Sequence, residues 1–94
     1  MKQSWNNRRT DALARAFLTL KTPTEVKSFF RDLLTEEEII EFGRRFEVAW
    51  MLDANIPYTD ITKATGLSST TIARVSRWLR RGKGGYNLVL KRLK

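Results

Sequence analysis

The sequence predicts an all-α fold of short helices joined by short turns, and three observations support this. Apolar residues recur three or four positions apart along much of the chain, which is the spacing of one helix face. Helix-start signatures precede these stretches, and no segment alternates apolar and polar residues as a half-buried strand would. The 94 residues contain no repeat or low-complexity segment, so we expect a single domain over residues 1–94.

The first two helices are predicted from an apolar face and a capping signature. The first is expected over residues 10–21, because Leu13, Phe17 and Leu20 fall on one face. The second begins at "TPTE" (22–25), where the first threonine can cap and the proline suits the first helical position. The glutamate is expected to complete a capping box.

The third helix is expected to begin at "LTEEE" (34–38), where Thr35 can cap the helix. The three glutamates lie in the first turn, where the helix dipole favours negative charge. The helix runs to about Ala54, and Asn55 suits a left-handed position beyond its end. Gly43 in its middle costs up to about 1 kcal/mol against alanine, so we expect it to mark close packing against a neighbour.

The first two helices and the segment before them carry more large apolar side chains than one small core can cover. Such a surplus on an exposed face is typical of an interface between chains. We therefore expect residues 1–54 to supply dimerisation helices as well as core helices. The side chains are Trp5, Leu13, Phe17, Leu20, Phe29 and Phe30.

Residues 57–81 are predicted to form a helix-turn-helix. A short helix starts near Tyr58, and Gly66 permits the tight turn between two crossed helices. Leu67 is expected to pack under this turn, and Ser68 can cap the helix that follows.

The second helix of this motif has an inward and an outward face. Ile72, Val75 and Leu79 are spaced to face the core. Short hydroxyl side chains and arginines remain on the outer face, where they can contact base edges or phosphates in the major groove. The predicted DNA-binding residues are Ser68, Ser69, Thr70, Thr71, Arg74, Arg77, Arg80, Arg81 and Lys83.

A closing helix over residues 86–94 is expected to pack on the core. Its apolar spacing predicts that Tyr86, Val89, Leu90 and Leu93 face inward. We also expect Trp78 to pack against the body of the domain rather than to stack on bases.

The charge of the chain is concentrated at one end. Residues 61–94 contain nine basic residues and no acid, whereas residues 1–60 contain nine basic and ten acidic residues, which gives a net charge of +8. This distribution is typical of a protein that binds a polyanion.

The composition also excludes several classes of protein. Without cysteine or histidine the chain has no disulfide, no thiolate metal site and no imidazole base. The acids lie where helix capping explains them, so we expect neither an enzyme nor a metal protein. There is no secretion signal and no apolar run near the ~20 residues of a membrane span, so we expect a cytoplasmic protein.

Three segments carry a family resemblance: "LTEEEIIEFGRRFEVAWML" (34–52), "YTDITKATGLSSTTIARVSR" (58–77) and "GGYNLVLKRL" (84–93). They cover well over half of the chain and resemble the Trp repressor superfamily, most closely its short YerC/YecD-type branch. The resemblance implies a helical bundle whose N-terminal helices interlock with those of a second subunit in a homodimer. It also implies that each helix-turn-helix binds half of a palindromic operator.

The resemblance further implies an effector pocket beside the recognition helix, where the Trp repressor holds free tryptophan between two arginines. The matching residues are Thr35, Arg74 and either Arg44 or Arg45. Two positions depart from the pattern. Val75 replaces a glycine, and its side chain would intrude on an indole, while Asp32 replaces an apolar residue. We therefore expect no cofactor: these two residues argue against tryptophan as co-repressor, and any other effector is unknown.

Two hypotheses from different classes fit the sequence. The first is a repressor-like transcriptional regulator, a homodimer that binds specific double-stranded DNA through its helix-turn-helix and associates with the nucleoid when bound. The alternative is a helical dimeric interaction module whose basic face binds an acidic protein. Absence of binding to random duplex at low salt would favour the alternative.

Overall fold

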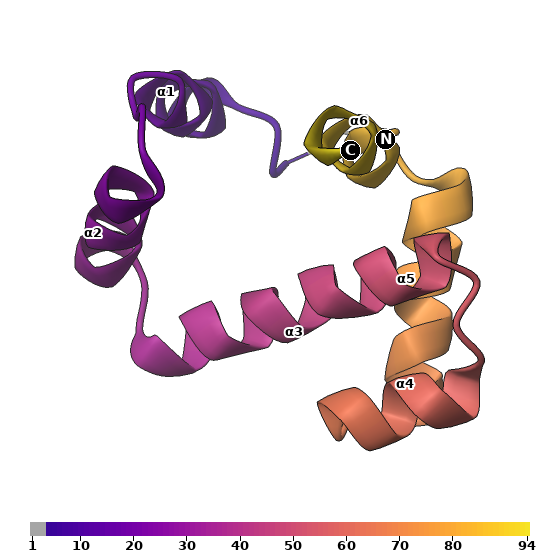
Figure 1. Ribbon diagram of the computed structural model, residues 1–94. Coiled ribbons are helices and arrows are strands. Elements are labelled where there is room, and N and C mark those ends of the chain that lie inside the picture. Colours follow the sequence, from indigo (N-terminus) through magenta and orange to yellow (C-terminus); the bar gives the residue numbers. More distant parts are fainter. Residues whose placement is uncertain (1–3) are drawn as a thin grey trace. The chain divides into compact units, whose positions relative to one another are not determined.

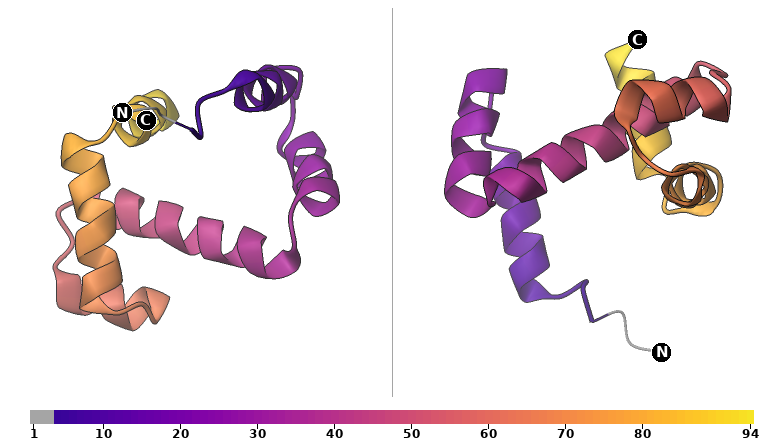
Figure 2. Two further views of the ribbon diagram at one scale, coloured as in Figure 1. Left: turned by 180° about the vertical axis from the view of Figure 1, so that it is seen from behind. Right: turned by 90° about the horizontal axis from the view of Figure 1, so that it is seen from below.

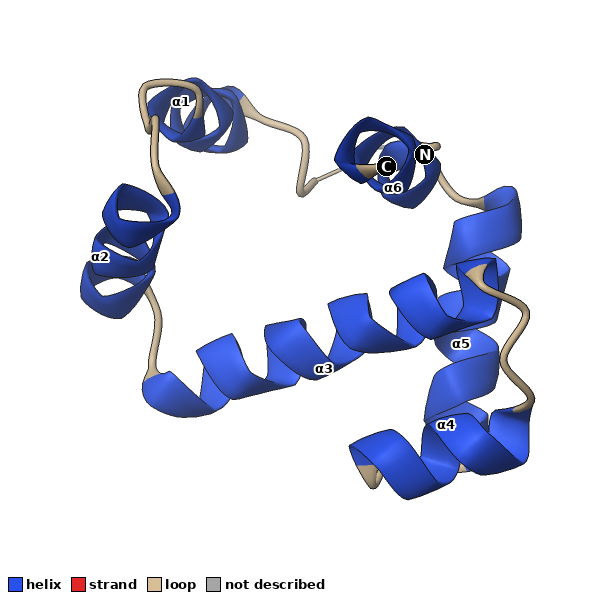
Figure 3. Cartoon of the chain, viewed as in Figure 1, coloured by secondary structure: helices blue, strands red, loops and turns tan. Residues whose placement is uncertain are grey.

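The computed structural model describes residues 4–94, and all regular structure in that range is helical (Figures 1 and 3). The predicted all-α class is therefore confirmed. Within the same range, no helix is both long and apolar enough to cross a membrane. The helices are α1 (Arg8–Phe17), α2 (Pro23–Leu33), α3 (Glu36–Asp53), α4 (Tyr58–Thr65), α5 (Ser69–Arg81) and α6 (Gly85–Leu93).

The chain divides into two compact units, Met1–Ile39 and Ile40–Lys94. The boundary falls inside α3, so the first turn of this helix belongs to the first unit and the remainder to the second. The single domain expected over residues 1–94 stays a prediction.

The first helix differs from its prediction at both ends. It begins at Arg8 because the Asn7 side chain caps it, accepting hydrogen bonds from the amides of Arg9 (2.9 Å) and Thr10 (3.1 Å). It ends at Phe17, well before the predicted residue 21. Beyond that end the Thr19 hydroxyl donates to the Ala16 carbonyl (2.7 Å), a local bond that competes with continuation of the helix.

In the first unit, α1 and α2 meet through aromatic rings. The Phe17 ring lies edge-on to Phe29 (centroids 5.3 Å apart) and to Phe30 (6.1 Å). Even so, no residue of α1 or α2 is fully buried. Trp5 is 58% exposed and Leu18 is 84% exposed. The first unit therefore has apolar surface that its own residues do not cover.

The capping signatures account for the starts of α2 and α3. Thr22 caps α2, but Glu25 accepts from the Lys21 amide (2.8 Å), so the capping box predicted there is incomplete. At α3 the box is reciprocal. The Thr35 hydroxyl accepts from the Glu38 amide (3.1 Å), and the Glu38 carboxylate accepts from the Thr35 amide (2.9 Å).

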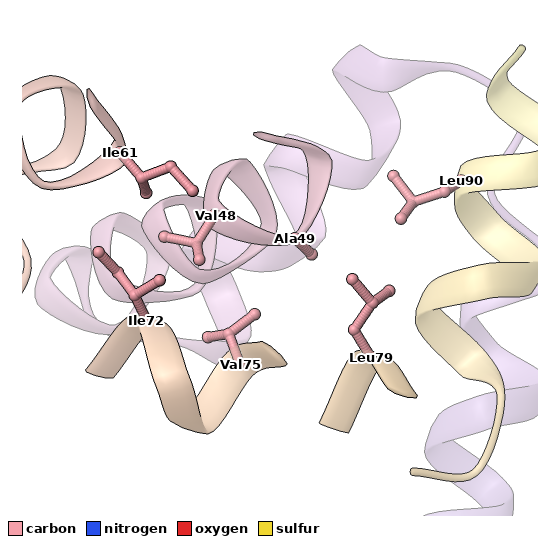
Figure 4. Packing of buried hydrophobic residues seen from close by; sticks show 7 residues of the cluster. All are labelled: Val48, Ala49, Ile61, Ile72, Val75, Leu79 and Leu90. Atoms are coloured by element: carbon pink, nitrogen blue, oxygen red, sulfur yellow. The ribbon is translucent and has the colours of Figure 1, made fainter. Parts of the chain in front are cut away.

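In the second unit, α4, α5 and α6 surround the C-terminal part of α3. Two further views show α5 crossing the end of α3 and joining α4 through a short turn (Figure 2). Seven buried apolar residues from these four helices form the core (Figure 4). They are Val48, Ala49, Ile61, Ile72, Val75, Leu79 and Leu90.

Three other predictions for the second unit can be compared with the structure. Asn55 has a left-handed backbone (φ 61°), as expected. Gly43 does not mark close packing, because a Cβ added there would meet no atom within 4 Å. The closing helix begins at Gly85 and buries Leu90, but Val89 and Leu93 are exposed. The prediction that these last two residues pack on the core was wrong, because only the Leu90 side of α6 faces it.

Candidate nucleic-acid interface

The turn between α4 and α5 is fixed by backbone and side-chain hydrogen bonds. Gly66 adopts a left-handed conformation (φ 73°), and its amide donates to the Thr62 carbonyl (2.8 Å). The buried Thr65 hydroxyl donates to the Ile61 carbonyl (2.7 Å) and accepts from the Leu67 amide (3.2 Å). Sequence reasoning missed Thr65, since only the folded turn brings its hydroxyl to these partners.

The start of the recognition helix α5 uses two of the predicted hydroxyl residues internally. The Ser68 hydroxyl accepts from the Thr71 amide (3.2 Å) and lies 3.2 Å from the Thr71 hydroxyl. Ser69 and Thr70 are exposed in the first turn. Amides at a helix N-terminus also attract phosphate, so this end of α5 offers hydroxyl and amide donors together.

The inward face of α5 is as predicted. Ile72, Val75 and Leu79 are buried, with exposures of 0%, 4% and 8%. The basic residues predicted for the outward face are exposed, and none of them forms an ion pair within residues 4–94. They are Arg74, Arg77, Arg80, Arg81 and Lys83. Their positive charge is thus available to a polyanion.

Trp78 does not pack into the body of the domain as predicted. Its side chain is 55% exposed, because the core positions of α5 are filled by the smaller Ile72, Val75 and Leu79. At the end of the same helix the Gly82 amide donates to the Trp78 carbonyl (2.9 Å).

A polar hollow of about 240 Å³ adjoins the recognition helix. Its wall includes Glu41 and Arg45 of α3, Arg74 and Val75 of α5, and Tyr86 of α6. The Arg45 Nε atom lies 3.6 Å from a Glu41 carboxylate oxygen. The positive charge of one of the two arginines in the hollow is therefore partly balanced.

The effector residues predicted from the family resemblance are brought together only in part. Arg45 and Arg74 both line the polar hollow, whereas Arg44 is not part of its wall. Val75 also forms part of that wall. Thr35, which caps α3, and the exposed Asp32 of α2 belong to the first unit. Thr71, Trp78 and Tyr86 complete the hollow. The last two were not predicted for it; the signal for Trp78 was its position four residues after Arg74.

This arrangement defines a helix-turn-helix protein with a basic, capped recognition helix. Residues 8–94 match the family model of the Trp repressor protein. The chain belongs to the Trp repressor family.

Relatives of known structure and sequence agree with this assignment. The chain is 42% identical over 84 residues to the uncharacterized protein YerC of Bacillus subtilis (strain 168), covering 89% of this chain and 81% of YerC. It is similar to the crystal structure of a TrpR-like protein from Eubacterium eligens, with a TM-score of 0.91, 40% identity and coverage of 98% and 95% of the two chains. A candidate Trp repressor from Staphylococcus aureus gives a TM-score of 0.90, 35% identity and coverage of 99% and 95%.

These similarities confirm the Trp repressor-like fold and the YerC-type resemblance. The family is one of regulators rather than enzymes, and it indicates a helix-turn-helix DNA-binding regulator.

Proposed function

We propose that this protein is a repressor-like transcriptional regulator that binds specific double-stranded DNA as a homodimer and catalyses no reaction. The observation that carries the proposal is α5 itself. This helix is held on the core by one face, while its outer face has arginines without ion-pair partners in the described part of the chain. Such a helix fits the major groove, with its N-terminal end toward the bases.

The predicted contacts divide into two kinds. Ser69, Thr70 and Arg74 would contact base edges or the adjacent phosphates, since they are exposed on the first turns of the helix, whereas the half-buried Thr71 hydroxyl is engaged by Ser68. The later basic residues would bind phosphates and supply affinity that is independent of sequence but sensitive to salt. They are Arg77, Arg80, Arg81 and Lys83. Ser68 would act chiefly by capping the helix.

The homodimer is supported by the apolar surface of the first unit. Trp5 is 58%, Leu13 37% and Phe17 36% exposed, and α1 and α2 have no buried residue. A second subunit whose N-terminal helices interlock with these would cover them. Two-fold symmetry would then place two recognition helices about 10 base pairs apart.

Tryptophan is excluded from the proposed mechanism. Val75 stands where the family pattern has a glycine and lines the hollow together with Arg45 and Arg74, so we infer that the hollow has less room for an indole than a glycine would leave. We infer that DNA binding needs no tryptophan, and that the protein acts in the cytoplasm, on the nucleoid when bound.

The direct test is selection of bound duplexes from a random pool, with and without tryptophan. We expect enrichment of a palindrome with half-sites about one helical turn apart, unaffected by tryptophan. No enrichment, together with no binding to random duplex at low salt, would favour the alternative of a module that binds an acidic protein.

A further inference from the structure

Trp78 forms the common wall of two hollows beside the recognition helix. One is the polar hollow of about 240 Å³ that Arg45 and Arg74 also line. The other, of about 480 Å³, is lined mainly by apolar side chains that include Phe46 of α3 and Val89 of α6, and also by Lys83. The indole therefore occupies the flank of α5 that faces α3 and α6.

Gly82 is suited to this placement of the indole. A Cβ on residue 82 would collide with the Trp78 carbonyl oxygen and would lie 3.0 Å from the indole Cε3 atom. Because the first of these is a backbone atom, a larger residue would have to displace the end of α5. The indole thus lies against the last turn of the helix, in a position that glycine permits.

Trp78 is not required for the core. Its side chain is 55% exposed and is not among the seven buried residues that join the four helices. It follows Arg74 by one helical turn, so the two side chains are neighbours on one face of α5 and both line the polar hollow. Trp78 therefore lies between a proposed base-reading residue and the helices that support it.

We propose that Trp78 is a positioning residue, a spacer built into the recognition helix that sets the angle of α5 without a bound small molecule. This inference rests on the proposed DNA-binding function. The buried residues Ile72, Val75, Ser76 and Leu79 attach α5 by one face, and Trp78 lies beside that face, where it would limit tilting of the helix toward α3 and α6. The indole is the shared wall of the two hollows on that flank, and its removal would take away this wall.

The test compares variants on the enriched palindrome and on a random duplex of equal length. Trp78→Ala is expected to bind the palindrome about tenfold more weakly, the order of one good base contact. On random duplex it should stay within about twofold, because phosphate contacts tolerate a change of angle. Trp78→Phe should keep most of the specific affinity. Leu88→Ala removes an exposed side chain that lines neither hollow, and should change neither affinity.

Chemical rescue gives a readout that a merely structural role would not move. The space left in Trp78→Ala adjoins aromatic and aliphatic side chains, among them Phe46 and Tyr86, which can contact a small aromatic molecule. Free indole should restore specific binding to Trp78→Ala and should leave the wild-type protein unchanged. Gly82→Ala keeps the indole but forces it and the helix end to shift, so this variant should also lose specific affinity.

Several outcomes would overturn the spacer role. The first is that Trp78→Ala and the wild-type protein bind the palindrome equally well. The second is a loss of specific affinity that indole does not reverse. The third is a loss of affinity that sedimentation shows to come from dissociation of the dimer. If the wild-type protein enriches no duplex, the proposed function itself fails. If the wild-type protein enriches a palindrome and Trp78→Ala binds that palindrome equally well, the spacer role alone fails.

Discussion

Replacement of Thr65 by valine tests whether the turn between α4 and α5 is held as described. Valine keeps the shape of threonine but removes a hydroxyl that accepts from the Leu67 amide (3.2 Å) and donates to the Ile61 carbonyl (2.7 Å). A buried donor left without a partner costs about 1–3 kcal/mol. Leu67 is half-buried, so water can reach its amide in part, and we expect a loss of about 1–2 kcal/mol.

The assay is thermal or urea unfolding of the wild-type protein, Thr65→Val and a matched control. The expected loss corresponds to a fall in Tm of at least about 4 °C for a chain of this size. Thr62→Val is the control, because Thr62 lies on the same helix but is exposed, and valine and threonine have similar helix propensities. Equal stability of Thr65→Val and wild type would refute the role given to this hydroxyl.

Other predictions concern the glycines, the proposed dimer and the phosphate contacts. Gly66→Ala should lower the free energy of unfolding by about 1–2 kcal/mol, because its φ of 73° disfavours a Cβ, whereas Gly43→Ala should raise it by up to about 1 kcal/mol, since the space there is open. Phe17→Asp should shift the protein from dimer to monomer in sedimentation equilibrium, because it places a charge on the exposed aromatic face of α1; an unchanged dimer would exclude that face as the interface. Lys83→Gln should reduce the slope of log affinity against log salt by about 0.9 for each subunit that contacts DNA, and an unchanged slope would show that Lys83 meets no phosphate.

The helix-turn-helix was predictable from sequence because its signals are local. Gly66, Ser68 and the spacing of Ile72, Val75 and Leu79 each depend on residues within a few positions, and the structure agrees with all of them. The reciprocal capping box at the start of α3 is local in the same sense.

Features that depend on more than the spacing of apolar residues were not predicted. Periodicity places Leu20 on the face of Leu13 and Phe17, but it does not reveal that the Thr19 hydroxyl binds the backbone just after α1 ends. It likewise places Val89 and Leu93 with Leu90, although the surface offered by α3 and α5 covers only Leu90. Trp78 was expected to pack against the body of the domain rather than to stack on bases, whereas smaller side chains of α5 fill the core.

The residues that line the polar hollow were also predicted only in part. The family pattern pointed to Arg74 and to one of two neighbouring arginines, and only the folded chain distinguishes Arg45, which lines the hollow, from Arg44. Glu41 lies four residues before Arg45 on the same helix, whereas Tyr86 joins them from α6, with no motif in the sequence to indicate its approach.

The central claim is that α5 reads DNA sequence from its outer face, and it is tested most directly by Arg74→Ala on the enriched palindrome and on random duplex at the same salt concentration. We expect a loss of about 1–3 kcal/mol on the palindrome and little change on random duplex, because one base contact is removed while the phosphate contacts remain. An equal loss on both duplexes, or no loss on either, would contradict the assignment of Arg74 as a base-reading residue.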